Sequence, residues 1–220
     1  MKKIITMALV VFLCAGFAAA QTGRITEISG TVELKPAGTA GFIPAKTGDT
    51  LSQDTIVSTG FKSSALITIG SSVITVRPLT RLSLAELSAA GNVETINVSL
   101  QSGRVRVDVN PPAGTRTNMT VRGPSATASV RGTGFDFDTR NLYVRHGVVA
   151  FQGAKGGVRL VGEGAGSALG ASGKAADPIE TTAIALVPPA PKGSDSGISR
   201  GGGQKDLAEL SINLNYDVQD

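Results

Sequence analysis

Apolar and polar residues alternate strictly along the middle of the chain. The clearest stretch, residues 104–109, reads Arg-Val-Arg-Val-Asp-Val. Residues 96–100 and 135–138 alternate in the same way. Successive side chains of a β-strand point to opposite faces, so a period of two predicts strands that bury one face and expose the other.

Glycines separate the apolar stretches at short intervals. Gly30, Gly103 and Gly147 are each followed by apolar residues at the second and fourth positions after the glycine. Residues 82–90 carry a weak helical pattern, which we interpret as a strand followed by a turn at Gly91. Short strands divided by turns predict an all-β fold, a solenoid-like or sandwich-like stack of short strands with Gly-rich turns.

The first twenty residues have the pattern of a secretory signal peptide. Lys2 and Lys3 precede an apolar run that ends in three alanines, so residues 1–20 are predicted to be removed and Gln21 to begin the mature protein. The apolar run is too short to favour a stable membrane span, which needs about 20 residues. The sequence therefore predicts a bacterial protein that is periplasmic or exposed at the cell surface, with no transmembrane segment after signal cleavage.

The C-terminal part of the chain has a different composition. Residues 166–205 are rich in Gly, Pro, Ala and Ser, which predicts a disordered linker because such a segment buries little apolar surface. Residues 206–220 regain apolar positions and are interpreted as an extra strand, a partner-binding peptide or a frayed end. Residues 21–165 are left as the β domain.

Positive charge concentrates in the β domain. Residues 21–165 hold 15 Lys and Arg against 10 Asp and Glu, and the tail from residue 166 holds 4 against 7. This excess is too small to indicate a nucleic-acid partner, and aromatic residues are too few for a single-strand platform. Five arginines form the candidate binding face for an envelope protein or an anionic envelope polymer: Arg104, Arg106, Arg122, Arg131 and Arg145. The alternative is a solvated face with scattered ion pairs.

The sequence offers little that indicates catalysis. His146 is the single histidine, and Cys14, the single cysteine, falls in the predicted signal peptide. Asp136 and Asp138 share a predicted strand face, which we interpret as an acidic edge that balances nearby arginines. We therefore expect no enzyme activity, no cofactor and no metal site.

One succession of motifs is specific. Small residues precede Val-Arg-Gly-Thr-Gly-Phe at 130–135, and His-Gly-Val-Val follows at 146–149. Upstream lie Val-Ser-Thr-Gly at 57–60, Ser-Ser-Ala at 63–65 and Gln-Ser-Gly at 101–103. In this order the segments resemble the FecR family of bacterial envelope domains over about residues 30–164.

The resemblance implies an all-β envelope module. Full-length FecR-type regulators also have a cytoplasmic anti-sigma region and a membrane span, so we expect here a stand-alone exported FecR-like protein without those regions. Its function is then binding or scaffolding of another envelope protein; the alternatives are a glycan- or peptidoglycan-associated structural protein, or a component of envelope signalling. No pattern in the sequence specifies an oligomeric state.

The Arg-Gly-Thr segment of these motifs also has a predicted structural role. Gly132 would permit a tight turn, Thr133 would hydrogen-bond local backbone, and Arg131 would bridge neighbouring coils through carbonyl groups. The alternative interpretation is that these three residues contact a ligand.

Overall fold

The computed structural model describes residues 21–178 of the chain. The predicted signal peptide, residues 179–205 of the predicted linker and the segment 206–220 lie outside these residues. The described part consists of two β-sheets, as the alternating sequence predicts.

The eight-stranded sheet contains the following strands in spatial order: β17 (Gly166–Ala168), β14 (Asn141–His146), β13 (Gly134–Phe137), β10 (Val105–Val109), β7 (Ser72–Val76), β6 (Ser64–Ile69), β1 (Gly23–Ser29) and β4 (Thr50–Leu51). The nine-stranded sheet contains β16 (Arg159–Val161), β15 (Val149–Gly153), β12 (Ala126–Val130), β11 (Arg116–Arg122), β9 (Val93–Ser102), β8 (Arg81–Ala90), β5 (Ile56–Thr59), β2 (Val32–Lys35) and β3 (Ile43–Pro44).

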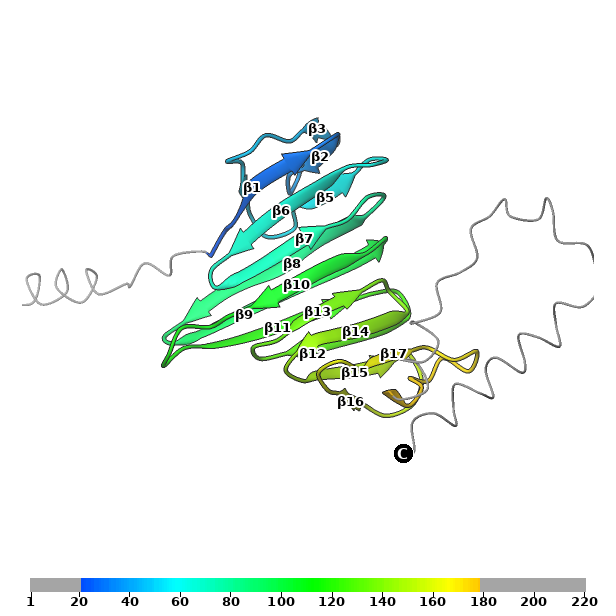
Figure 1. Ribbon diagram of the computed structural model, residues 1–220. Helices are drawn as coiled ribbons and strands as arrows, with labels where there is room; N and C mark the ends of the chain where they lie inside the picture. The colour runs from blue at the N-terminus through cyan, green and yellow to red at the C-terminus, as the bar shows by residue number, and fades with distance from the viewer. Residues whose placement is uncertain (1–20, 179–220) are drawn as a thin grey trace, which may run out of the picture. The chain divides into compact units, whose positions relative to one another are not determined.

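The chain passes repeatedly from one sheet to the other. The hairpin β6–β7 belongs to the eight-stranded sheet, β8–β9 to the nine-stranded sheet, β10 to the first again, and β11–β12 to the second. Both sheets therefore grow in step along the chain, from an end formed by β1–β4 to an end formed by β16 and β17 (Figure 1). Neighbouring strands are antiparallel except β9 and β11, which are parallel. This stacking of short strands in two layers confirms the predicted fold class.

The segment with the weak helical pattern is the long strand β8. Leu82, Leu84 and Leu87 are buried, and the pairing with β9 shifts register between Leu84 and Glu86. A β-bulge adds one residue, so the inward face moves from position 84 to 87 instead of 86. That spacing of three residues imitates a helix in the sequence, while the turn at Gly91 follows as predicted, with φ 57°.

The core lies between the two sheets. Its buried aliphatic side chains come from both layers, and burial of each such side chain stabilises the fold by about 1.5–3 kcal/mol. Phe137 of β13 meets Phe151 of β15 edge to face, with ring centroids 6.2 Å apart, so this contact joins one sheet to the other.

The folded region continues past residue 165. Strand β17 pairs with β14, and Leu169 forms a bridge with Ala175; both of these residues are buried. The first part of the predicted linker thus closes the C-terminal end of the eight-stranded sheet.

Candidate functional site

Buried hydroxyl groups hold the points where the chain crosses between sheets. Thr59 donates to the carbonyl of Arg77 at 2.6 Å and accepts from the N–H of Thr80 at 3.0 Å. Thr80 in turn donates to the carbonyl of Arg104 at 3.1 Å and accepts from its N–H at 3.0 Å. Because strand ladders end at these crossings, the side chains supply the hydrogen bonds that the backbone groups need.

The Arg-Gly-Thr segment at 131–133 forms another such crossing, from β12 to β13. Thr133 is buried and donates to the carbonyl of Val148 at 3.1 Å, and Gly132 has a φ of 148°. The turn and the hydrogen bond agree with the predicted structural roles, although the partner lies 15 residues away and not locally. Arg131 does not bridge coils: its side chain is exposed and makes no hydrogen bond or ion pair within residues 21–178.

Four arginines gather on the outer face of the eight-stranded sheet. Asp136 of β13 lies 3.0 Å from Arg106 of β10, 3.3 Å from Arg145 of β14 and 3.8 Å from Arg77, next to the end of β7. The register explains this cluster, because Arg106 and Asp136 are direct cross-strand partners. Opposite charges at paired positions of neighbouring strands stabilise the sheet.

Two more aspartates complete this cluster. Arg104 pairs with Asp138 at 3.2 Å, and Arg145 pairs with Asp108 at 2.7 Å while also donating to the carbonyl of Val107. His146 lies 3.7 Å from Asp108. We call these four arginines and three aspartates, with His146, the ion-pair cluster. Its arginines face almost as many carboxylates, so little of their charge is left uncompensated.

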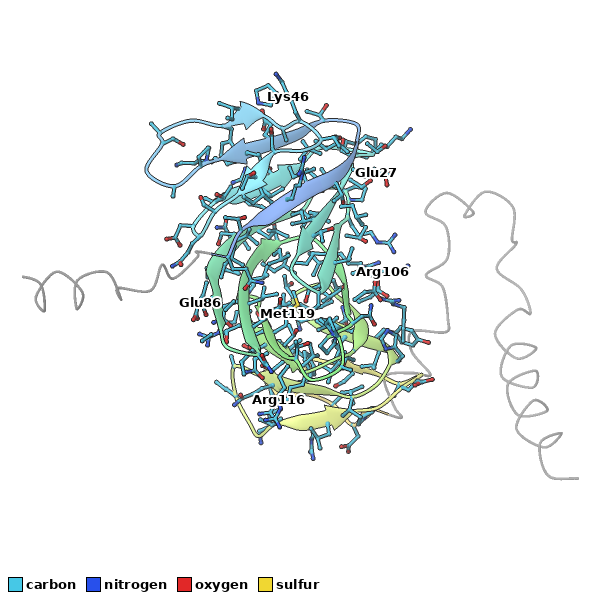
Figure 2. The ribbon with its side chains drawn as sticks, turned by 90° about the vertical axis from the view of Figure 1, so that its left-hand side faces the viewer. Glu27, Lys46, Glu86, Arg106, Arg116 and Met119 are labelled. Carbon is cyan, nitrogen blue, oxygen red and sulfur yellow. The ribbon has the colours of Figure 1, made fainter. Side chains whose placement is uncertain are left out.

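The other two arginines of the predicted binding face lie on the nine-stranded sheet. Arg122 ends β11 and Arg131 follows β12; both are exposed, and neither has an ion pair or side-chain hydrogen bond among the described residues. The structure thus brings Arg104, Arg106 and Arg145 together and separates them from Arg122 and Arg131 by the whole thickness of the two layers. In Figure 2, Arg106 and Glu86 mark the two opposite outer faces, with Met119 between them.

The outer face of the nine-stranded sheet is mostly polar and uncharged. The strand register aligns its side chains in rows that cross β8, β9, β11, β12 and β15. One row consists of Ser83, Ser99, Arg122, Thr127 and Gln152, and the next consists of Glu86, Asn97, Thr120, Ser129 and Ala150. Short hydroxyl and amide side chains make this face flat, and the arginines project from it.

A shallow hollow of about 460 Å³ lies on this face, above β11, β12, β15 and β16. Its floor is formed by Asn118, Thr120 and Ser129. Val148 and Leu160, which are 54% and 70% exposed, form an apolar side, and Arg131 stands at the end of the hollow. The hollow offers polar groups, aliphatic surface and one unpaired cation together, which is the mixture that ligand sites use to fix a partner.

Comparison with known proteins adds a family to this geometry. Residues 55–158 match the family model described as FecR protein. The chain carries a FecR domain. A search of curated protein sequences gave no match.

Two crystal structures are similar to the chain that carries this FecR domain, and both are of a proposed anti-sigma factor from Parabacteroides distasonis. The first has 16% identity and a TM-score of 0.45, over 59% of this chain and 63% of that one. The second has 15% identity and a TM-score of 0.45, over 73% of this chain and 74% of that one. The chain thus spans less than two thirds of the first structure's length.

The match covers the central strands of both sheets. It begins just before β5 and ends just before β16, so it includes the ion-pair cluster and the floor of the hollow. Strands β1–β4, β16 and β17 lie outside the matched residues. Leu160, the outer part of the apolar side of the hollow, is therefore a feature of this chain beyond the matched FecR residues.

The acidic residues of the FecR domain are engaged by cations or donors. Asp136 and Asp138 face arginines, as the sequence interpretation expects. Residues 21–178 contain no group of three or more His, Cys, Asp or Glu residues arranged to hold a metal ion. Within the same residues, no helix has the length and apolar character needed to cross a membrane.

Sequence reasoning missed the floor of the hollow and one further cluster. Asn118, Thr120 and Ser129 alternate with buried residues, which predicts an outward face but not a hollow. Glu94 was also missed: its carboxylate accepts from Ser71 at 2.9 Å and from the buried Thr117 at 3.0 Å. No sequence pattern links these residues, because they meet only where β9, β11 and the β6–β7 turn come together.

Proposed function

We propose that this chain is an exported module of the bacterial cell envelope that binds another envelope protein through its FecR domain, in a signalling or scaffolding role. The observation that carries the proposal is the family match over residues 55–158. The FecR family is regulatory and typically associated with the envelope. The signal-peptide pattern of residues 1–20 supports export.

The architecture supports a binding role. Two layers of short strands share one continuous core, and buried hydrogen bonds hold the crossings, so we expect both outer faces to be preorganised. Rigid faces lose little conformational entropy when they bind, which favours their use as contact surfaces.

Site-specific photo-cross-linking tests this proposal. A photo-reactive residue is placed at Thr75 on the eight-stranded face and at Ser129 on the nine-stranded face. Lys46, which lies outside the ion-pair cluster and the hollow, is the control position. We expect one face to capture a defined envelope protein in living cells. Capture from neither face, in protein shown by N-terminal sequencing to be exported and to begin at Gln21, would overturn the binding role.

A second candidate function is attachment to an anionic envelope polymer. It is supported by Arg122 and Arg131, which are exposed and lack acidic partners among the described residues. Sedimentation with purified cell wall, at low and high salt, separates the two candidates. Salt-sensitive sedimentation without protein cross-links would favour the polymer.

A further inference from the structure

We propose that the hollow on the nine-stranded sheet, together with Arg122 beside it, binds an extended, acidic segment of polypeptide, with Arg131 and Arg122 receiving two carboxylates and Leu160 contacting an aliphatic side chain between them. The inference rests on the proposed function and assigns its contact surface and the chemistry of its partner.

The unpaired arginines point to an anionic ligand. The arginines of the ion-pair cluster have carboxylates within 4 Å, whereas Arg131 and Arg122 have none among the described residues. The acids nearest to this face are held elsewhere, including Asp177, which lies 3.7 Å from Arg159. Glu86 accepts a hydrogen bond from Asn97, two strands from the floor of the hollow, and Glu163 accepts one from the N–H of Gly147 at 3.4 Å. A guanidinium binds a carboxylate with two parallel hydrogen bonds, so each free arginine is a ready anion site.

The spacing of the two arginines fits an extended chain. Arg122 is the direct partner of Thr127 on β12, and Arg131 lies four residues beyond Thr127. Four residues of strand span about 13 Å. An extended peptide that runs along β12 repeats at the same rise, so acidic residues four positions apart on one face would meet both arginines.

The row between the arginines is suited to an aliphatic side chain. Thr120, Ser129, Ala150 and Leu160 are aligned across four strands. The hydroxyl oxygens of Thr120 and Ser129 are 3.3 Å apart and can hydrogen-bond to each other, so neither needs a polar partner from a ligand. Ala150 has only a small side chain. Leu160 therefore offers its exposed surface to a residue that lies midway between two bound carboxylates.

The same row favours polypeptide over glycan. A polypeptide can place an aliphatic side chain two residues from each of two acids. The apolar faces of sugars pack best on aromatic rings, and the residues that line the hollow include none. We therefore assign the site to an acidic polypeptide, and an anionic polysaccharide becomes an outcome of the test.

A designed peptide tests the assignment with purified protein of residues 21–220. The probe is a fluorescein-labelled Gly-Ser-Glu-Ser-Val-Ser-Glu-Ser-Gly, whose glutamates lie four positions apart with valine between them. The control peptide has the same composition but puts its glutamates three positions apart, on opposite faces of an extended chain. Binding is measured by fluorescence polarisation at low and high salt, with polygalacturonate as the anionic polysaccharide.

Two matched pairs of variants accompany the probe. Arg131→Gln is compared with Lys46→Gln, which removes the same charge from an exposed site outside the ion-pair cluster and the hollow. Leu160→Ser is compared with Ile43→Ser, which removes an exposed aliphatic residue at the opposite edge of the same sheet. Circular dichroism checks that each variant is folded.

We expect saturable, salt-sensitive binding of the probe that weakens about tenfold in Arg131→Gln, the loss of one charge-assisted contact, and less in Leu160→Ser. The Lys46→Gln and Ile43→Ser proteins should bind normally, and the control peptide should bind more weakly. No saturable binding up to about 1 mM, or equal losses in Arg131→Gln and Lys46→Gln, would overturn the inference. Polygalacturonate that binds through Arg131 while the peptide does not would also overturn it.

The proposed function can fail or stand separately. If Ser129 cross-links an envelope protein and Arg131→Gln leaves that cross-link unchanged, the contact chemistry is wrong but the binding role holds. If peptide binding behaves as expected and no envelope protein is captured from either face, the binding role in the cell is wrong.

Discussion

The two outer faces of this protein carry arginines of the same type in opposite situations. On the eight-stranded sheet, Arg104, Arg106 and Arg145 each contact an aspartate, and Asp136 alone is shared by three guanidiniums. On the nine-stranded sheet, Arg122 and Arg131 project beside hydroxyl and amide groups with no acid in contact. The first arrangement uses charge to hold strands together, and the second leaves charge available for a partner. Counting arginines in a sequence does not distinguish these uses.

The largest expected effect comes from the inner side of the charged face. Val107 of β10 is fully buried between Arg106 and Asp108, so Val107→Asp places an unpaired carboxylate in the core. We expect the domain to unfold at room temperature, as measured by circular dichroism. Thr120→Asp, the same new charge on the outer face of the nine-stranded sheet, is the control and should remain folded. A cooperative, native-like melt of Val107→Asp would contradict the assignment of the core.

Removal of the shared carboxylate should give the next largest effect. Asp136→Ala leaves Arg77, Arg106 and Arg145 close together without their common partner. We expect a loss of about 2 kcal/mol in the free energy of unfolding, since hydrogen bonds to charged groups are lost but the arginines stay partly solvated. Urea denaturation measures this value. The control Glu33→Ala removes an exposed acid of β2 and should change stability by less than about 0.5 kcal/mol; equal effects would show that the cluster is not structural.

The sequence predicts the strands of this fold better than it predicts which residues form the candidate site, and the reason is physical. Alternation reports only which face of a strand is inward, and a residue two positions along is on the same face in any sheet. The strands predicted from residues 104–109 and 135–138 are therefore confirmed as β10 and β13. The sheet to which each strand belongs depends on the crossings, where Thr59, Thr80 and Thr133 bond to residues 15 to 24 positions away. The motifs that resemble FecR include Thr59 and Thr133, but their pattern does not show which strands these threonines join.

The five predicted arginines show this limit directly. All of them alternate with apolar residues or flank such residues, so all are outward in the sequence and outward or half-buried in the structure. Their division between two faces follows from β10, β13 and β14 joining one sheet while β11 and β12 join the other. The charge pairing of Arg106 with Asp136 depends on strand register over 30 residues of chain. A single sequence carries no local signal for such a pairing.

Charge reversal on the paired face should have a moderate effect. From the sequence alone, Arg104 and Arg106 lie on an exposed face, and exposed charges contribute little to stability, so reversing both charges should barely change the melting temperature. In the structure, Arg104→Glu and Arg106→Glu would place new carboxylates beside Asp138 and Asp136. We expect the double variant to lose at least about 1 kcal/mol of stability through repulsion at the half-buried Arg106 position, measured by thermal and urea unfolding. High salt should restore part of the loss by screening. Unchanged stability at low salt would show that these ion pairs contribute nothing to the fold.

The smallest effect on stability should come from the arginines of the nine-stranded sheet that lack ion pairs. This effect separates them most clearly from the paired arginines of the eight-stranded sheet. Arg122→Gln and Arg131→Gln remove two exposed guanidiniums that hold no structural partner among residues 21–178. Each should change the free energy of unfolding by less than about 0.5 kcal/mol, since surface substitutions away from packed or paired groups are usually that small. Urea denaturation measures this, and the conservative pair Arg106→Gln and Arg145→Gln on the other face provides the comparison. If glutamine at 122 and 131 destabilises the protein as much as glutamine at 106 and 145, the arginines of the nine-stranded sheet are structural too. In that case Arg122 and Arg131 would contribute to the fold instead of binding a partner, and the ion-pair cluster would become the candidate contact surface.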